Sequence, residues 1–450
     1  MTTTDDSVSA FIVAACVPRD RDHSSGTIEG AEAILAAHPE VRNASIHTAA
    51  ILGDDALVRQ FVALEATNAT AKGGRYGWDP LTHLCFSNYL RLDRVRTEGF
   101  VRAATALLDA GASANSGFAE PGHQPEPEWE PVLYGACGVA HHPEVTRLLL
   151  ERGANPNDAE VAYHTPETRD NRAMKLLVET GKLTAESLAI MLIRKHDWHD
   201  VQGVKYLLEH GADPNGERKR GWYAMHHALA RDNALAMFEL LLDHGADPMI
   251  VNHGMTAVVR AAHEGRSDVL DLMEQRGIPI VLHGVDALIA ACARGDGATV
   301  RAIARREPQL VRRLLADGAR LLARFTLTEN AGGVQQLLDI GVPVTARYGG
   351  DGYFGIAKDS TALHVAAWLL RTVMVKLLLE RGAQVDVRDG TGRTPLALAV
   401  RANVDSYWTE RRSPALVEAM LLAGASVRGV PFPSGYDDVD DLLRRHGAAP

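Results

Sequence analysis

The stretch TALHVAAWLLRTVMVKLLLERGA at residues 361–383 forms one complete helix–turn–helix pattern. Its first helix contains Ala366 and Ala367, whose small side chains let a neighbouring helix approach closely. After a break near Arg371, apolar residues recur at helical spacing in VMVKLLLE, which predicts a second, amphipathic helix. Gly382 follows at the position where a helix end favours a residue with positive φ. Because one such pair cannot bury its apolar side alone, the pattern predicts further copies on either side.

Copies of this pattern run along most of the chain. In the clearest copies a Thr-Pro-Leu-like opening precedes the closing glycine by a constant interval, as from Thr256 to Gly277. The same interval places Glu65 and Glu307 at the ends of two copies that lack the glycine. The glycines that close the other copies are Gly111, Gly153, Gly181, Gly211, Gly245, Gly277, Gly341, Gly382 and Gly424.

A repeat of about 33 residues with a Thr-Pro-Leu-His-x-Ala opening is the pattern of ankyrin repeats. In its openings, helix spacing and Gly-Ala ends, the chain resembles the ankyrin-repeat family over residues 8–447. The resemblance implies an all-α, ankyrin-repeat α-solenoid of about twelve helix-turn-helix repeats with long finger loops. We expect one domain over residues 1–450, with an N-terminal capping repeat at residues 8–38 and a C-terminal capping helix at residues 436–447.

Composition narrows the class of partner. The chain of 450 residues has a formal net charge of −10, which gives no electrostatic reason to expect nucleic acid. Its one basic cluster, Arg218-Lys219-Arg220, is interpreted as a solvated loop tip. No segment is long and apolar enough to predict a membrane span. Four cysteines are too few for a disulfide framework, so we expect reduced, buried thiols and a cytoplasmic protein. We also expect a monomer.

Long insertions carry many of the aromatic residues in segments predicted to be exposed fingers. One such finger is the loop GFAEPGHQPEPEWEP at residues 117–131, where proline and glycine exclude a helix. Aromatic side chains are common anchors of protein interfaces. The alternative is that these rings pack against their own repeats. The candidate partner-binding residues are Arg75, Tyr76, Trp78, Trp129, Trp222, Tyr223, Tyr353 and Phe354. Tyr407 and Trp408 mark a further exposed insertion.

Histidines do not predict a catalytic site. The resemblance assigns His47, His226 and His364 to hydrogen bonds with the backbone of neighbouring turns, and Tyr134 takes this position in another copy. The run at residues 196–200, HDWHD, is the most metal-like, but no cysteine lies near it in sequence and it falls at a bend between two helices. We therefore expect no metal site and no cofactor.

The leading functional hypothesis is a non-enzymatic protein- or peptide-binding module or scaffold that uses its concave groove and finger loops. No phosphate-binding loop, nucleophile elbow or zinc-protease motif is present. The alternative is a small-molecule-binding protein or an enzyme, with a pocket closed by the long fingers and groups such as His83 and His227 brought together there. A deep, partly apolar cavity with convergent ionisable groups favours this alternative.

Overall fold

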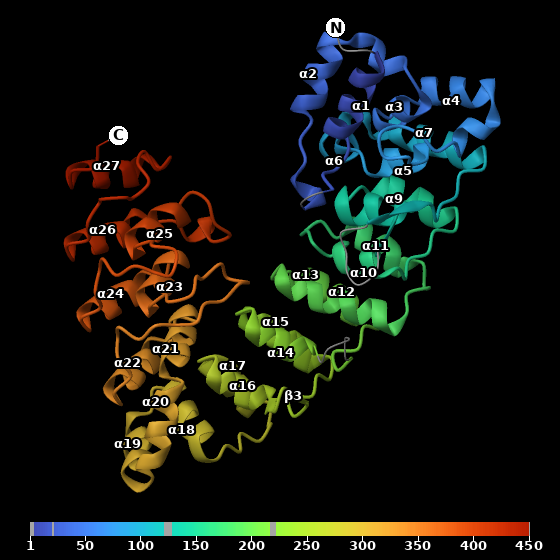
Figure 1. Ribbon diagram of the computed structural model, residues 1–450. Helices are drawn as coiled ribbons and strands as arrows, with labels where there is room; N and C mark the ends of the chain where they lie inside the picture. The colour runs from blue at the N-terminus through green and yellow to red at the C-terminus, as the bar shows by residue number, and fades with distance from the viewer. Residues whose placement is uncertain (1–3, 20–21, 121–127, 217–221, 450) are drawn as a thin grey trace. The chain divides into compact units, whose positions relative to one another are not determined.

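The computed structural model describes residues 4–19, 22–120, 128–216 and 222–449, and it is mostly helical (Figure 1). Contacts divide the chain into two compact units, which are described separately below. The first unit comprises residues 1–227 and 240–246, and the second comprises residues 228–239 and 247–450. The basic cluster Arg218-Lys219-Arg220 lies outside the described residues.

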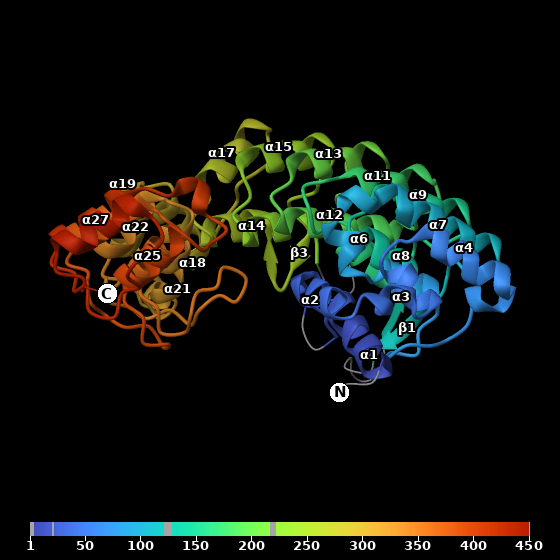
Figure 2. The same cartoon turned by 90° about the horizontal axis from the view of Figure 1, so that it is seen from above.

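The first unit is built from helix pairs stacked in two layers. The first helices of the pairs, α3, α5, α8, α10 and α12, pack in order against one another, and the second helices α4, α7, α9 and α11 form a parallel row, which Figure 2 shows along one side. The bounds are α1 Thr4–Ala15, α2 Glu29–Ala37, α3 Ile46–Ile51, α4 Asp55–Leu64, α5 Pro80–Cys85, α6 Asn88–Leu92, α7 Thr97–Asp109, α8 Val132–Tyr134, α9 Pro143–Glu151, α10 Ala159–His164, α11 Arg172–Glu179, α12 Ala185–Asp197, α13 Val201–Glu209, α14 Ala224–Ala230 and α15 Leu235–Asp243. The last two helices contain the boundary between the units.

The second unit continues the pairing with one additional helix. Helix α20 follows α19 directly, and α18 packs against both α20 and α22. Pro308 lies in the first turn of α20, where proline is tolerated because the backbone N–H there has no partner within the helix. The bounds are α16 Ala257–His263, α17 Ser267–Gln275, α18 Gly284–Ala293, α19 Gly297–Arg306, α20 Pro308–Ala316, α21 Gly318–Leu327, α22 Ala331–Asp339, α23 Ala362–Trp368, α24 Thr372–Glu380, α25 Pro395–Ala402, α26 Pro414–Leu422 and α27 Asp437–Arg445.

Helix ends are fixed by local side-chain caps and glycines. The Thr184 side chain accepts a hydrogen bond from the Ser187 backbone N–H and caps α12. Gly382 adopts a φ of 83° after α24, as its position predicts. Where the glycine is missing, Glu65 ends α4 with a φ of −156°, because a residue with a Cβ avoids the left-handed region. All nine closing glycines named above have positive φ.

Two short hairpins depart from the all-α expectation. β1, Gly117–Glu120, pairs antiparallel with β2, Glu128–Pro131, and β3, Val251–Asn252, pairs with β4, Met255–Thr256. Both lie in connections between helix pairs, where the backbone groups need hydrogen-bond partners outside a helix. Strands β1 and β2 are also less exposed than expected for a finger, since Phe118 and Glu130 are buried.

Two buried arginines, Arg324 and Arg266, and the half-buried Arg371 connect the turns of the second unit. Arg324 of α21 is 5% exposed; it pairs with Glu264, contacts Asp351 at 3.1 Å and donates to the Ala230 carbonyl at 3.1 Å. Arg371 contacts Asp232 at 2.9 Å and donates to the Leu327 carbonyl at 3.0 Å. Arg266 donates to the Asn233 carbonyl at 2.6 Å and contacts Asp232 at 3.4 Å. Turns from four helix pairs are thereby joined through charged side chains.

None of the helices in the described ranges is both long enough and apolar enough to cross a bilayer. The four cysteines, Cys16, Cys85, Cys137 and Cys292, are buried and form no disulfide.

Replacing Gly382 by alanine tests the helix-end geometry. The added Cβ meets no atom within 4 Å, so the cost comes from the positive φ alone. We expect a loss of roughly 1–2 kcal/mol in unfolding free energy, measured by urea denaturation. Gly349→Ala is the matched control, because that position has equal space and no positive φ. Equal effects of the two substitutions would contradict this account.

Replacing Arg324 by methionine tests the buried charges. The variant leaves the Glu264 carboxylate, which is 5% exposed, without its closest cation. We expect a loss of about 3–5 kcal/mol in unfolding free energy. Arg381→Met removes the more exposed ion pair with Asp339 and should change stability by less than about 1 kcal/mol. A small effect at Arg324 would show that the network adds little to stability.

Candidate functional site

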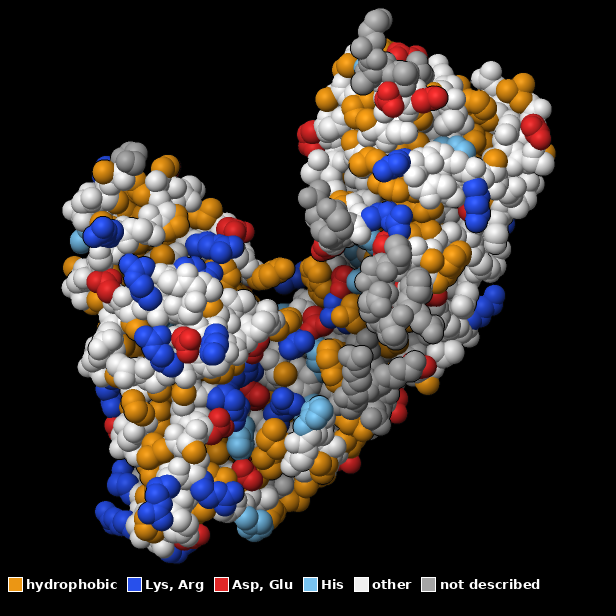
Figure 3. All heavy atoms as spheres, in the orientation of Figure 1, with side chains coloured by type: hydrophobic (Ala, Val, Ile, Leu, Met, Phe, Trp, Pro, Cys, Tyr) orange, Lys and Arg blue, Asp and Glu red, His pale blue; other side chains and the backbone are white. Residues whose placement is uncertain are grey.

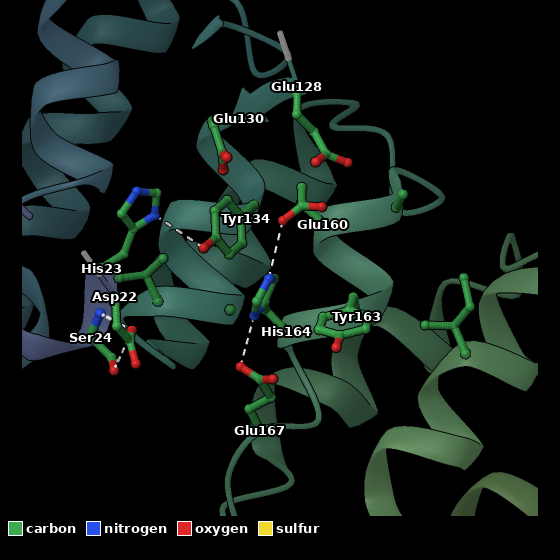
Figure 4. A pocket seen from close by; sticks show the side chains of 14 residues that line it. Asp22, His23, Ser24, Glu128, Glu130, Tyr134, Glu160, Tyr163, His164 and Glu167 are labelled. Carbon is green, nitrogen blue, oxygen red and sulfur yellow. Dashed lines mark hydrogen bonds and ion pairs between the residues drawn. The ribbon is translucent and has the colours of Figure 1, made fainter. Parts of the chain in front are cut away.

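A cavity of about 700 Å³ opens in the first unit, and Figure 4 shows its side chains. Its walls come from the segment before and within η1, His23–Ser25, from strand β2, from α8 and its π-helical continuation η5, Gly135–Val139, and from α10. The lining residues are Asp22, His23, Ser24, Glu128, Glu130, Tyr134, Gly138, Val139, Ala159, Glu160, Tyr163, His164, Glu167 and Ile190.

Alternation along the β1–β2 hairpin aims Glu130 inward. Phe118 pairs with Glu130, and Ala119 pairs with Trp129, in the antiparallel register. Successive side chains of a strand point to opposite faces. Phe118 and Glu130 are accordingly buried, whereas Ala119 is exposed and Trp129 is 48% exposed. One face of the hairpin thus carries a wall of the cavity, and the other carries an exposed indole.

Helix α10 supplies an ionic group to the opposite wall. His164 Nε2 lies 3.1 Å from a Glu160 oxygen, and His164 Nδ1 lies 2.7 Å from a Glu167 oxygen. Although burial opposes the charge, hydrogen bonds with both glutamates raise the pKa of His164 to about 9. The imidazole is therefore a cation at neutral pH. Burial opposes the Glu167 charge too, but bonding to His164 and pairing with Arg194 lower the pKa of Glu167.

Close packing brings Tyr134 beside this histidine. The ring centroids of Tyr134 and His164 are 5.1 Å apart, and the Tyr134 hydroxyl lies 3.1 Å from His23 Nδ1. A Cβ at Gly138 would lie 2.7 Å from the Tyr134 ring and 2.9 Å from His164 Cβ, so only glycine permits this approach. Burial lowers the pKa of His23, which favours its neutral form.

Glu130 is the least satisfied group of the cavity. Its side chain is 1% exposed, and its Oε2 has no hydrogen-bond partner within the part of the chain that the structure describes. Burial and then the nearby carboxylate of Glu160 raise the pKa of Glu130 to about 8. At neutral pH this carboxyl is mostly protonated, and it can become charged when a cation enters the cavity.

The candidate partner-binding residues fall into three groups by exposure. Arg75, Trp129 and Tyr353 are exposed. Tyr76, Trp222 and Tyr223 are half-buried. Trp78 and Phe354 are each 4% exposed, so the expected exposure is wrong for both. Whether any of the eight binds a partner stays a prediction.

Local packing explains the burial of Trp78. Its ring stacks on Phe118 at 4.3 Å between centroids and lies 4.6 Å from that of Tyr76. Arg19 covers the Phe118 ring at 5.1 Å and contacts Glu120 at 3.1 Å. Two fingers and the N-terminal segment therefore pack together. In this part of the chain the aromatic rings pack within the protein, which agrees with the alternative to partner binding.

The finger before α23 also folds back on its own unit. Phe354 packs in a cluster with Ile356, Val365 and Leu369, and its carbonyl accepts a hydrogen bond from Trp368 Nε1 at 2.6 Å. Tyr353 remains at the surface, with the Arg231 guanidinium 3.9 Å from its ring centroid. In the further insertion, Tyr407 is 86% exposed.

Two of the three motif histidines, His47 and His364, make the expected hydrogen bonds to the backbone of neighbouring turns. His47 Nε2 donates to the Ala71 carbonyl at 2.9 Å, and His364 Nε2 donates to the Arg393 carbonyl at 3.1 Å. In the metal-like run, His196 is fully buried and its Nδ1 contacts the Leu192 carbonyl. The described residues contain no group of three or more potential ligands arranged to hold a metal ion. His83 is buried beside Trp78, with 5.3 Å between the ring centroids, whereas His227 pairs with Asp197 at 2.8 Å.

Sequence reasoning missed the cavity residues Glu130, Glu160, His164 and Glu167. The copy that ends at Gly181 differs from the repeat pattern, because Ala162-Tyr163-His164 stands where the usual opening should be. A departure from a structural motif is a signal of a functional site. The alternation Glu-Trp-Glu at residues 128–130 was a second signal, because it places the acids and the indole on opposite faces of a strand.

Replacing Glu130 by glutamine tests its burial as a neutral acid. The folded-state pKa of about 8 exceeds the ordinary value of 4.5. The contribution of the Glu130 carboxyl to the unfolding free energy is therefore complete below pH 4.5 and is lost as the pH rises through 8. From pH 5 to pH 8, the unfolding free energy of the wild type should fall by on the order of 3 kcal/mol more than that of Glu130→Gln. Urea denaturation at each pH measures this. Glu98→Gln, at an exposed position of α7, should show the same decrease of unfolding free energy with pH as the wild type. The same decrease in Glu130→Gln would contradict the assignment of Glu130 as a buried neutral acid.

Comparison with known proteins identifies the repeats. The family model described as "Ankyrin repeats (3 copies)" matches residues 161–252 and 187–283, and the model described as "Ankyrin repeat" matches residues 358–390. Protein PhlB of Serratia liquefaciens is 40% identical over 134 residues, which are 29% of this chain and 53% of that protein. The chain thus spans about half the length of this curated relative.

Two solved ankyrin repeat domains are similar to parts of the chain. That of human ASB11 is 21% identical, covers 52% of this chain and 98% of its own, and has a TM-score of 0.23. The ankyrin repeat domain of Bcl-3 is described as that of a unique member of the IkappaB protein family. It is 20% identical, covers 51% of this chain and 97% of its own, and has a TM-score of 0.23. The family matches coincide with helix pairs and with closing glycines in positive φ at Gly211, Gly245 and Gly382. The chain is an ankyrin-repeat protein.

Proposed function

We propose that this chain is a protein- or peptide-binding module that acts by recognition without chemistry. Ankyrin repeats are typically protein-binding, and the family matches support this class of function. The observation that carries the proposal is the exposure of large aromatic side chains on finger loops: Trp129 is 48% exposed and Tyr353 is 36% exposed. A preformed surface of stacked helices lowers the ordering cost of binding.

The proposal extends to the organisation of the chain. We take the helix pairs outside the matched residues as divergent repeats, about twelve in all, which form one solenoid over residues 1–450 with end caps at residues 8–38 and 436–447. α1 and α2 in the first cap and α27 in the second support this assignment. The four buried cysteines, which form no disulfide, support a protein of the reducing cytoplasm. The proposal takes the protein as a monomer.

The exposed members of the candidate set are the proposed anchors. Arg75 and Trp129 belong to neighbouring fingers of the first unit, because Trp78 and Phe118 of the same fingers stack on each other. Tyr353 is the anchor on the second unit. The half-buried residues Tyr76, Trp222 and Tyr223 form part of the surrounding contact surface, and Trp78 and Phe354 support the fingers from within.

A second candidate function is the binding of a small molecule in the cavity of the first unit. Its volume of about 700 Å³ falls within the range of about 300–1,000 Å³ that small-ligand pockets occupy. Strand β2 of a long finger forms one of its walls, as the alternative hypothesis expects. Convergent ionisable groups line this cavity, which favours ligand binding over a purely structural role.

Alanine variants of the anchors test protein binding. The partner is first isolated by affinity capture from the native cell and identified by mass spectrometry, and its Kd for the purified chain is then measured. We expect Trp129→Ala or Tyr353→Ala to weaken binding by about tenfold or more, because aromatic anchors carry most interface energy. Leu64→Ala is the control, since Leu64 is 75% exposed on α4 and lies outside the fingers. An unchanged Kd in both aromatic variants would exclude these finger surfaces as the binding site.

A further inference from the structure

We propose that the cavity between β2, α8 and α10 is a binding site for a guanidinium or ammonium group, of the kind that an arginine or lysine side chain of a protein partner presents. The inference rests on the proposed protein-binding function and adds the chemistry of the partner. It is carried by an excess of carboxyl groups around the cavity and by one buried carboxyl oxygen without a hydrogen-bond partner.

Acidic groups dominate the wall of the cavity. Its described lining contains five carboxyl groups and neither lysine nor arginine. The cations beside it are already paired: His164 contacts Glu160 and Glu167, and Arg194 contacts Glu167 and Asp197. The five carboxyl groups belong to Asp22, Glu128, Glu130, Glu160 and Glu167.

Glu130 gives the independent evidence for a ligand. Its side chain is 1% exposed and lines the cavity, yet its Oε2 accepts no hydrogen bond from any described residue. An unsatisfied buried polar atom costs about 1–3 kcal/mol. A guanidinium or ammonium N–H is a suitable missing donor, because charge-assisted hydrogen bonds to carboxylates are among the strongest in proteins.

Two aromatic rings make the cavity fit an organic cation. Tyr134 and Tyr163 line it together with the carboxyl groups, and cations bind favourably over such rings. The Arg194 guanidinium, which does not line the cavity, lies 4.1 Å from the Tyr163 ring centroid, so this ring already contacts one cation of the chain itself. The volume of about 700 Å³ exceeds the needs of one guanidinium and admits a whole basic side chain with part of its backbone.

The N-terminal half of the chain, which contains the cavity, has a net negative charge, and this charge favours a basic partner. Residues 1–227 contain 22 Lys and Arg against 31 Asp and Glu, whereas residues 228–450 contain 25 against 26. On the face shown in Figure 3, Lys and Arg side chains are spread over the C-terminal helices. An acidic surface attracts cationic ligands and raises their association rate.

Binding should be coupled to proton release. Glu130, whose pKa is about 8, loses its proton when a cation binds beside it, so affinity should rise between about pH 6 and pH 8. The charged and titratable groups that face Glu130 from the surrounding elements are Glu120 of β1, Glu128 of β2, Tyr134 of α8, and Glu160 and His164 of α10.

Calorimetric titration of the full chain with acetyl-Gly-Arg-Gly-amide tests the site. The citrulline peptide, which is neutral and of the same shape, should bind at least about tenfold more weakly. Glu130→Gln should lose at least about tenfold in affinity for the arginine peptide together with the pH dependence, and Glu128→Gln, at an exposed lining position, should also weaken binding. Glu98→Gln should bind like the wild type.

Equal affinity for the arginine and citrulline peptides, or unchanged binding by Glu130→Gln and Glu128→Gln, would overturn the inference. If methylguanidinium binds as tightly as the arginine peptide, the cation site stands but its ligand is a free small cation, which overturns the assignment to a partner side chain. Failure of this site leaves the proposed function open to its own test, because Trp129 lies on the opposite face of the hairpin.

Discussion

Burial of the apolar side of each helix pair by the next pair is the interaction on which the structure depends. A single pair would leave the apolar residues that face its neighbours exposed, so stability is shared among neighbours along the stack. The contacts of α3 with α5 and of α4 with α7 show how both layers propagate. Connections between pairs bury some of their own side chains, such as Trp78 and Phe354. Their exposed parts are the segments that can change length and acquire binding groups.

The second unit departs from nearest-neighbour packing. Arg371 and Asp232 are 139 residues apart in sequence and yet form an ion pair. Asn330 similarly donates to the Gly265 carbonyl at 2.7 Å and to the Ala293 carbonyl at 2.6 Å. Such contacts connect pairs that are not adjacent in sequence, so this unit should unfold more cooperatively than an ideal repeat array, in which each repeat contacts only its neighbours.

The repeat pattern predicted the helices well because it depends on local chemistry. Apolar spacing, capping residues such as Thr184 and closing glycines such as Gly382 act within one or two turns of chain. The candidate site was largely missed because its parts come from distant segments: Glu130 and His164 meet only after the hairpin packs against α10. Likewise, nothing local to Trp78 shows that Phe118, in another finger, will cover it.

Strand β2 carries both the exposed Trp129 indole and the cavity-lining Glu130 carboxyl, and the strand register directs them to opposite faces of the β1–β2 hairpin. Insertion or deletion of a single residue in β2 before Trp129 would exchange the faces, turning the indole toward the cavity and the Glu130 carboxyl toward solvent. This finger is therefore constrained in length as well as in composition. Related chains that keep both the exposed indole and the inward carboxyl should differ in the length of this strand only by an even number of residues.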